Sequence, residues 1–193
     1  MSLFLGPIHY WLYNKIQLQE DFTQFLLRKQ PEAYKSLDNS CQAPARCALE
    51  EVIDTGNIHG WLQGQVTIVE NRFAAAVAKL LDSGVTPDAI QEEARNFGSS
   101  RPISASSAAE VFTQLQNLLL DGMPCDHVNQ VSVQTDEEVI WIRTTDIHAS
   151  YWEKEGLTSD IYYQLRAAFV EGMLDGSGFG FQMEDNRFCI RKM

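Results

Sequence analysis

The stretch VNQVSVQTDEEVIWIR, residues 128–143, is where the sequence changes from helical to strand-like patterning. Apolar and polar residues alternate on both sides of Asp136–Glu137, and this period of two is typical of a β-hairpin. The alternating apolar residues are Val131, Val133, Ile140 and Ile142. Pairing Val131 with Ile142 puts all four on one face, whereas a slip of one residue would turn them to the other face. The stretch therefore predicts a hairpin with its turn at Asp136–Glu137.

Residues 1–122, before this hairpin, are predicted to be mostly helical. An apolar stripe over residues 8–26 recurs at helical spacing and indicates one long helix that ends near Arg28. Thr86–Pro87 is a typical helix start, with Gly98 as the expected stop.

Two other features of the helical part bear on packing. Residues 29–45 contain two prolines and many small polar residues, so we expect a connection with at most one short helical turn. Gly60 and Gly64 lie four residues apart on a predicted helix, and small residues at that spacing allow close contact with another helix.

Residues after the hairpin return to a helical pattern over 159–176 and then to a second hairpin. A two-residue turn at Asp185–Asn186 would pair Met183 with Phe188 and Phe181 with Ile190. The sequence thus predicts an α+β protein, with a helical subdomain (1–122) followed by a ββαββ subdomain (123–193). Together they form one compact domain with an antiparallel sheet packed on helices, and the seam between them is the natural place for a cavity.

Composition limits the partners. The chain has 193 residues and a formal charge of -11, with no run rich in Lys and Arg, so it would repel nucleic acid. No apolar run is long enough to span a membrane, and the N-terminus lacks the basic start of a secretory signal. The four cysteines form no CxxC pair and are read as free thiols. A cytoplasmic location is the expectation.

A candidate metal site follows if the first hairpin keeps its register. His127 would then lie opposite Asp146, and Cys125 opposite His148, with Cβ atoms about 5 Å apart in each pair. Two imidazoles, a thiolate and a carboxylate would suit zinc, or iron if a coordination position stays open. Glu153 could be a further ligand or the base for a metal-bound water.

The same residues allow two other interpretations. Cys125 activated by His148, with Asp146 orienting the ring, would be the core of a cysteine hydrolase, and Glu153 the base of a metal-assisted one. Ordinary core is the other interpretation, because Pro124 can end the strand early and ten-residue strands are long.

Function is predicted as the binding of a small molecule or metal cofactor at the seam. Five aromatic residues would supply the apolar walls, the first three as ligand-binding residues: Trp141, Tyr151, Trp152, Tyr162 and Phe169. A hydrolase that uses the Cys/His/Asp cluster is one alternative. A non-catalytic structural or regulatory subunit, which forms a homodimer through an exposed helix stripe, is another.

Overall fold

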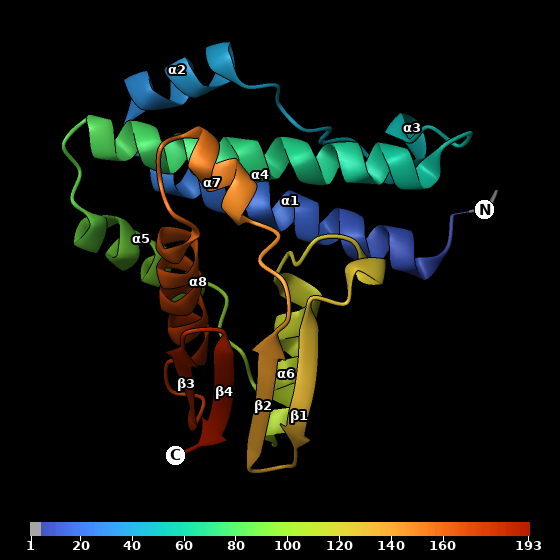
Figure 1. Cartoon of the computed structure of the whole chain (residues 1–193), viewed down its shortest axis with the longest axis vertical. Helices are drawn as coiled ribbons and strands as arrows, with labels where there is room; N and C mark the ends of the chain where they lie inside the picture. The colour runs from blue at the N-terminus through green and yellow to red at the C-terminus, as the bar shows by residue number, and fades with distance from the viewer. Residues whose placement is uncertain (1–4) are drawn as a thin grey trace.

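The computed structural model describes residues 5–193 and confirms the α+β fold (Figure 1). The helices of the first part are α1 (Pro7–Leu27), α2 (Pro31–Ser40), α3 (Leu49–Val52), α4 (Ile58–Asp82), α5 (Pro87–Ser99) and α6 (Ala108–Leu118). The second part contains a short 3-10 helix η1 (Pro124–Asp126), β1 (Asn129–Gln134), β2 (Glu138–Arg143), α7 (Ala149–Lys154), α8 (Ser159–Leu174), β3 (Phe179–Glu184) and β4 (Arg187–Lys192). Within residues 5–193, no helix is both long and apolar enough to cross a membrane.

The four strands form one antiparallel sheet in the order β1-β2-β4-β3. One face of the sheet packs against α6 and α8, and Figure 1 shows α6 directly behind the β1–β2 hairpin. The buried residues of this face that join the main core are Val139, Trp141, Phe179, Phe188 and Ile190. The sheet is therefore a half-covered layer beneath the helical part.

The sequence predicted the strand register correctly for one hairpin and only in part for the other. In β3–β4, Met183 pairs with Phe188 and Phe181 with Ile190, so the predicted register is confirmed. In β1–β2 the turn at Asp136–Glu137 and the pair Val133–Ile140 are as predicted, but a bulge after Val131 shifts the pairing by one residue.

The bulge means that Val131 pairs with Trp141 instead of Ile142. Val131 and Ile142 are both 38% exposed, whereas Trp141 is buried against the helices. The prediction that Val131 pairs with Ile142, so that the four valines and isoleucines share one face, is therefore wrong. Trp141 faces the helices, where its wide, flat indole buries more apolar area than either neighbour.

Two helices were missed by the sequence patterns. Residues 31–40 form α2, a ten-residue helix that begins at Pro31, where proline is well tolerated. Residues 149–154 form α7, so the second part is ββααββ instead of the predicted ββαββ.

The closest helix crossing joins the two parts of the chain at Gly98 of α5 and Gly172 of α8. A Cβ atom at Gly98 would lie 2.1 Å from the Phe169 carbonyl oxygen, and one at Gly172 would lie 2.1 Å from the Arg95 carbonyl oxygen. Gly98 therefore lies inside its helix and does not end it. Gly64, expected at such a contact, has no atom within 4 Å of an added Cβ.

Helices α1 and α4 lie side by side and form the upper layer in Figure 1. The main core fills the space between this layer, α5, α6, α7, α8 and the sheet. A second, smaller apolar cluster lies between the first half of α1, α3 and the first half of α4. The seam runs between α1 and α4 on one side and α8 on the other.

Candidate functional site

The predicted Cys/His/Asp cluster does not form. Strand β1 begins at Asn129, and the residues before it turn away through η1. His127 has a positive φ of 48°, which breaks the alternation of an extended strand. Cys125 and His127 are exposed, whereas His148 is buried. The register that placed them together is therefore wrong from Val131 back towards the N-terminus, and the strand itself goes no further than Asn129.

No group of three or more His, Cys, Asp or Glu side chains within residues 5–193 is placed to hold a metal ion. Asp146 instead organises the start of α7 and α8. Its carboxylate accepts hydrogen bonds from the His148 backbone N–H (3.0 Å), the Ser159 hydroxyl (2.6 Å) and the Tyr163 hydroxyl (3.0 Å). Burial opposes ionisation, but these hydrogen bonds prevail and lower the pKa of Asp146. In the described part of the chain, the four side chains predicted to hold zinc or iron are therefore not gathered at one point.

The side chain of His148 contacts α4 instead of Cys125. Its Nδ1 lies 3.0 Å from Oε2 of Glu70 on α4, and both side chains are almost fully buried. Its ring stacks on the Tyr162 ring, with centroids 3.8 Å apart. Glu153, on α7, is exposed. No hydrogen bond within residues 5–193 links the predicted catalytic side chains of Cys125, His148 and Glu153.

The predicted ligand-binding aromatics lie in three different places. Trp141 stacks on Phe188 in the core of the sheet. Tyr151 is half-buried at the edge of the main core. Trp152 is fully buried beside Phe73, with ring centroids 5.7 Å apart.

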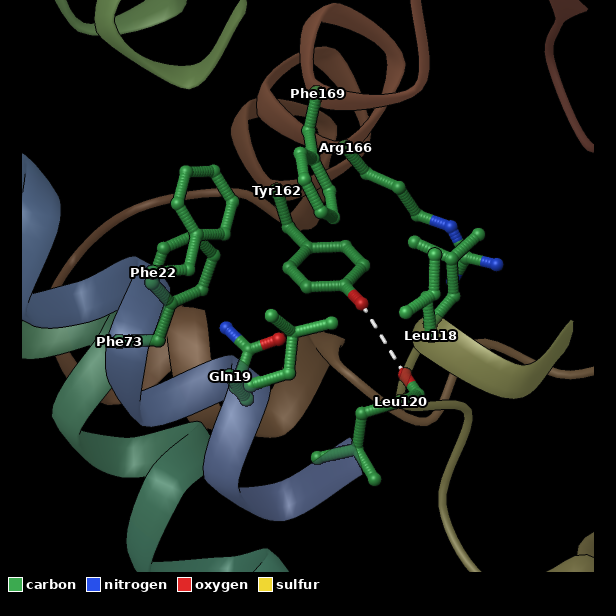
Figure 2. Close-up of a pocket in the computed structure, with 10 residues that line it drawn as sticks. Gln19, Phe22, Phe73, Leu118, Leu120, Tyr162, Arg166 and Phe169 are labelled. Carbon is green, nitrogen blue, oxygen red and sulfur yellow. Dashed lines mark hydrogen bonds between the residues drawn. The ribbon is translucent and has the colours of Figure 1, made fainter. Parts of the chain in front are cut away.

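A pocket does lie at the seam, between α1, α4, α8 and the end of α6 (Figure 2). Its apolar wall consists of three phenylalanine rings and four leucines: Phe22, Phe73, Phe169, Leu18, Leu118, Leu119 and Leu120. The space open to the centre of a water-sized sphere is about 20 Å³, enough for about one water molecule. Tyr162 and Phe169, two of the aromatics suggested by the sequence, line this pocket.

Three polar side chains interrupt the apolar wall: Gln19, Tyr162 and Arg166. The Tyr162 hydroxyl donates a long hydrogen bond of 3.4 Å to the Leu120 carbonyl oxygen, drawn in Figure 2. Arg166 forms a two-pronged ion pair with Asp121. Gln19 is different, because its Nε2 is buried and has no hydrogen-bond partner within residues 5–193.

Electrostatics in this region follow from burial. Arg166 offsets the burial of Asp121 and lowers the pKa of that carboxyl to about 2. Asp121 in turn keeps Arg166 charged, with its pKa above the ordinary value although burial acts against it. Burial raises the pKa of the Tyr162 hydroxyl well above its ordinary value, so that hydroxyl stays neutral. The pocket therefore has one neutral hydroxyl, one neutral amide and one neutralised ion pair.

Unpaired polar atoms concentrate around the two adjacent tyrosines Tyr162 and Tyr163. Within residues 5–193 the buried side-chain atoms without a hydrogen-bond partner are Gln19 Nε2, Glu70 Oε1, Arg143 Nη1 and Trp152 Nε1. Gln19 lines the pocket with Tyr162, and Glu70 holds the His148 ring that stacks on Tyr162. The Trp152 ring lies 6.0 Å from Tyr162, and the Arg143 guanidinium lies over Tyr163 at 3.7 Å.

Buried polar groups in native proteins nearly always have a partner, in the protein or in a bound water or ligand. Four such atoms around one pair of side chains mark this seam as the candidate site. The sequence did contain a signal. Lys15 and Gln19 interrupt the buried stripe of α1 between Leu12 and Phe22, at the spacing of core positions.

Comparison with known proteins identifies no relative: no family model, curated protein or solved structure matches this chain.

Proposed function

We propose that this protein binds a compact neutral molecule at the seam pocket, and that Gln19 holds a carbonyl oxygen of that molecule. The observation that carries the proposal is the buried, unpaired Nε2 of Gln19 in the pocket wall. A buried donor without a partner costs about 1–3 kcal/mol, and a ligand oxygen would recover that cost.

The lining supports a neutral carbonyl compound with an apolar body. Three phenylalanine rings and a tyrosine ring surround the space and favour an aromatic or aliphatic group. Arg166 is already neutralised by Asp121, so a ligand carboxylate would meet a carboxylate instead of a free cation. A carboxamide fits best, because its C=O accepts from Gln19 Nε2 and its N–H can donate to Gln19 Oε1.

A ligand larger than one water requires one wall to move. Most lining residues belong to α1, α4 and α8, but Leu119 and Leu120 lie beyond the end of α6 in an extended segment. Such connecting segments move at less cost than packed helices. We expect this segment to make room for the ligand.

Titration with benzamide, followed by NMR at the Gln19 side-chain NH₂ resonances, tests the proposal. Benzamide should produce saturable shifts there, and Gln19→Leu should weaken binding by about tenfold, the worth of one hydrogen bond in a buried site. Gln24→Leu is the matched control, since Gln24 on the same helix binds Glu20 outside the pocket and should leave benzamide binding unchanged.

Benzoate and ethylbenzene complete the test. If both compounds bind more weakly than benzamide, the neutral carbonyl is the group that the pocket recognises. Equal binding of ethylbenzene would refute the role of Gln19. The absence of any saturable shift with benzamide would leave a single water as the occupant and contradict the proposal.

A further inference from the structure

Strand β3 forms one edge of the sheet and pairs with β4 alone among the strands of residues 5–193 (Figure 1). Its pairing is regular from Phe179 to Glu184. An edge strand presents unpaired N–H and C=O groups, and proteins commonly block such an edge with a bulge, a proline or a lysine. Strand β3 contains none of these three, whereas the opposite edge strand, β1, contains a bulge.

The hydrogen bonds of the β3–β4 hairpin show which backbone groups of β3 are open. The Met193 N–H donates to the Gly178 carbonyl oxygen at 2.9 Å, in the same register as the rest of the hairpin. Residues that exchange hydrogen bonds alternate along an antiparallel pair. Every second residue from Gly178 onward therefore bonds to β4, and the N–H and C=O groups of Phe181 and Met183 point outward from the sheet.

A groove lies between this open edge and α8. It consists of two adjoining hollows, of about 300 Å³ beside the start of β3 and about 470 Å³ beside its end. Gln182 lines the groove as well as Phe181, although their side chains lie on opposite faces of the strand, so the groove reaches the strand edge itself. Its apolar lining includes Ala167 and Leu174 of α8 and Phe179, Phe181 and Met183 of β3.

The charges around the groove favour a basic partner. Glu171, Asp175 and Glu184 line it together with one cation, Arg95, which pairs with Glu171 at 2.9 Å and with Asp175 at 2.6 Å. Glu184 forms no ion pair within residues 5–193, not even with Arg187 opposite it on β4. A second copy of this chain is disfavoured, because it would bring the same acidic groups together and each chain has a formal charge of -11.

We propose that the β3 edge binds an extended basic peptide segment of another protein as a fifth, antiparallel strand. The peptide backbone exchanges hydrogen bonds with Phe181 and Met183. Side chains of an extended strand alternate between its two faces, so every second side chain enters the groove and is apolar. The side chains between them lie on the face of Glu184, where Lys or Arg meets an unpaired carboxylate. No residue that lines the groove lines the seam pocket, so this inference does not depend on the proposed function.

Fluorescence anisotropy with a short labelled peptide of alternating lysine and valine tests the inference on the wild-type protein. We expect saturable binding with a Kd below about 100 µM. N-methylation of the valine amides should abolish binding, because residues opposite Phe181 and Met183 in an antiparallel pair direct their N–H groups at β3. N-methylation of the lysine amides is the matched control and should leave the affinity within about threefold, since those N–H groups face solvent. Binding that survives methylation of the valines, or no saturable binding of the unmethylated peptide, would overturn the inference.

Glu184→Lys tests the charge of the groove. It should weaken peptide binding about fivefold, because repulsion replaces attraction beside the added strand. Glu155→Lys is the matched control, since Glu155 is exposed, forms no ion pair within residues 5–193 and lies between α7 and α8 outside the groove. Equal effects of the two substitutions would mean that the peptide responds only to overall charge, and would contradict binding at the groove.

Light scattering of the wild type and Met183→Pro tests whether a second copy occupies the edge instead. Proline removes the outward-facing N–H of this residue, a change that edge strands tolerate. We expect both proteins to be monomers and Met183→Pro to lose peptide binding. A wild-type dimer that Met183→Pro dissociates would assign the edge to a second copy and overturn the inference.

Discussion

Gln19 and Glu20 are neighbours on α1, yet they belong to two different buried polar clusters. The groups of one cluster are hydrogen-bonded to each other, whereas the other contains unpaired atoms. Both carboxylate oxygens of Glu20 accept hydrogen bonds from Arg72, at 3.0 and 2.9 Å. Arg72 also donates to Asp38 and to the Cys41 carbonyl oxygen. One position earlier, Gln19 enters the seam with its Nε2 unpaired.

The difference separates a structural clamp from a candidate site. The Glu20–Arg72–Asp38 cluster uses its hydrogen-bonding groups internally and ties α2 to α1 and α4. The seam around Tyr162 contains buried donors and acceptors that have no hydrogen-bond partner within residues 5–193. Mutations should therefore damage the clamp and be tolerated, or even favourable, at the open positions of the seam.

The largest expected effect is at the clamp. Arg72→Met leaves the Glu20 carboxylate buried without an opposite charge and with Gln24 as its remaining hydrogen-bond donor, so we expect a loss of about 3–5 kcal/mol in the free energy of unfolding. Urea denaturation followed by circular dichroism measures it. Arg46→Met is the control, because the Arg46–Asp21 pair is largely solvent-exposed and should contribute less than about 1 kcal/mol. Equal effects of the two substitutions would show that the clamp is not structural.

A smaller effect is expected at the charge pair of the seam. The pKa of Asp121 is about 2 in the folded protein and near 3.9 in an unfolded chain, so its ionisation stabilises the fold above about pH 4. That contribution is lost as pH falls from 4 to 2. The stability gap between wild type and Asp121→Asn should therefore narrow by about 2 kcal/mol over this range. Urea denaturation at several pH values measures the gap, and a constant gap would contradict the assigned pKa.

The smallest effect, and one of opposite sign, is expected at Gln19. Gln19→Leu puts an apolar side chain of comparable size in place of a buried unpaired donor, so the protein should become more stable by about 1 kcal/mol. Glu20→Leu is the matched comparison on the same helix and should be destabilising, because it leaves the Arg72 charge buried. If Gln19→Leu destabilised the protein by as much as Glu20→Leu, Gln19 would be a structural residue like Glu20, and the contrast between the clamp and the seam would be wrong.

Sequence reasoning predicted elements whose determinants are local. The turn at Asp185–Asn186 fixes the β3–β4 register, and Asp185 adopts the positive φ of 52° that such a turn requires. The bulge after Val131 left no trace in the period of two, because an inserted residue is specified by packing and not by alternation. The predicted pairs on the far side of the bulge from the turn, including those of the metal cluster, are therefore wrong, whereas the turn and the pair Val133–Ile140 are confirmed.

The pocket at the seam was predictable in position, but not all of its lining residues were. The seam followed from the order of helices and strands, and Tyr162 and Phe169 were expected as walls and do line the pocket. Gln19 was missed because the apolar residues around it were read as a continuous core stripe. His148 was predicted as a metal ligand or catalytic residue opposite Cys125, whereas its ring contacts Glu70, which lies on a helix that strand pairing could not reveal. Homodimerisation through a helix stripe stays a prediction.

The glycine crossing of α5 and α8 has a consequence for synthesis on the ribosome. Gly98 emerges early, and the backbone that fills the hollow beside it belongs to Phe169 and its neighbours, which are made near the end of the chain. Until α8 has been made, the apolar face of α5 that packs against it is therefore uncovered. Only after Gly172 has left the ribosome can the two helices close on each other and the walls of the seam assemble.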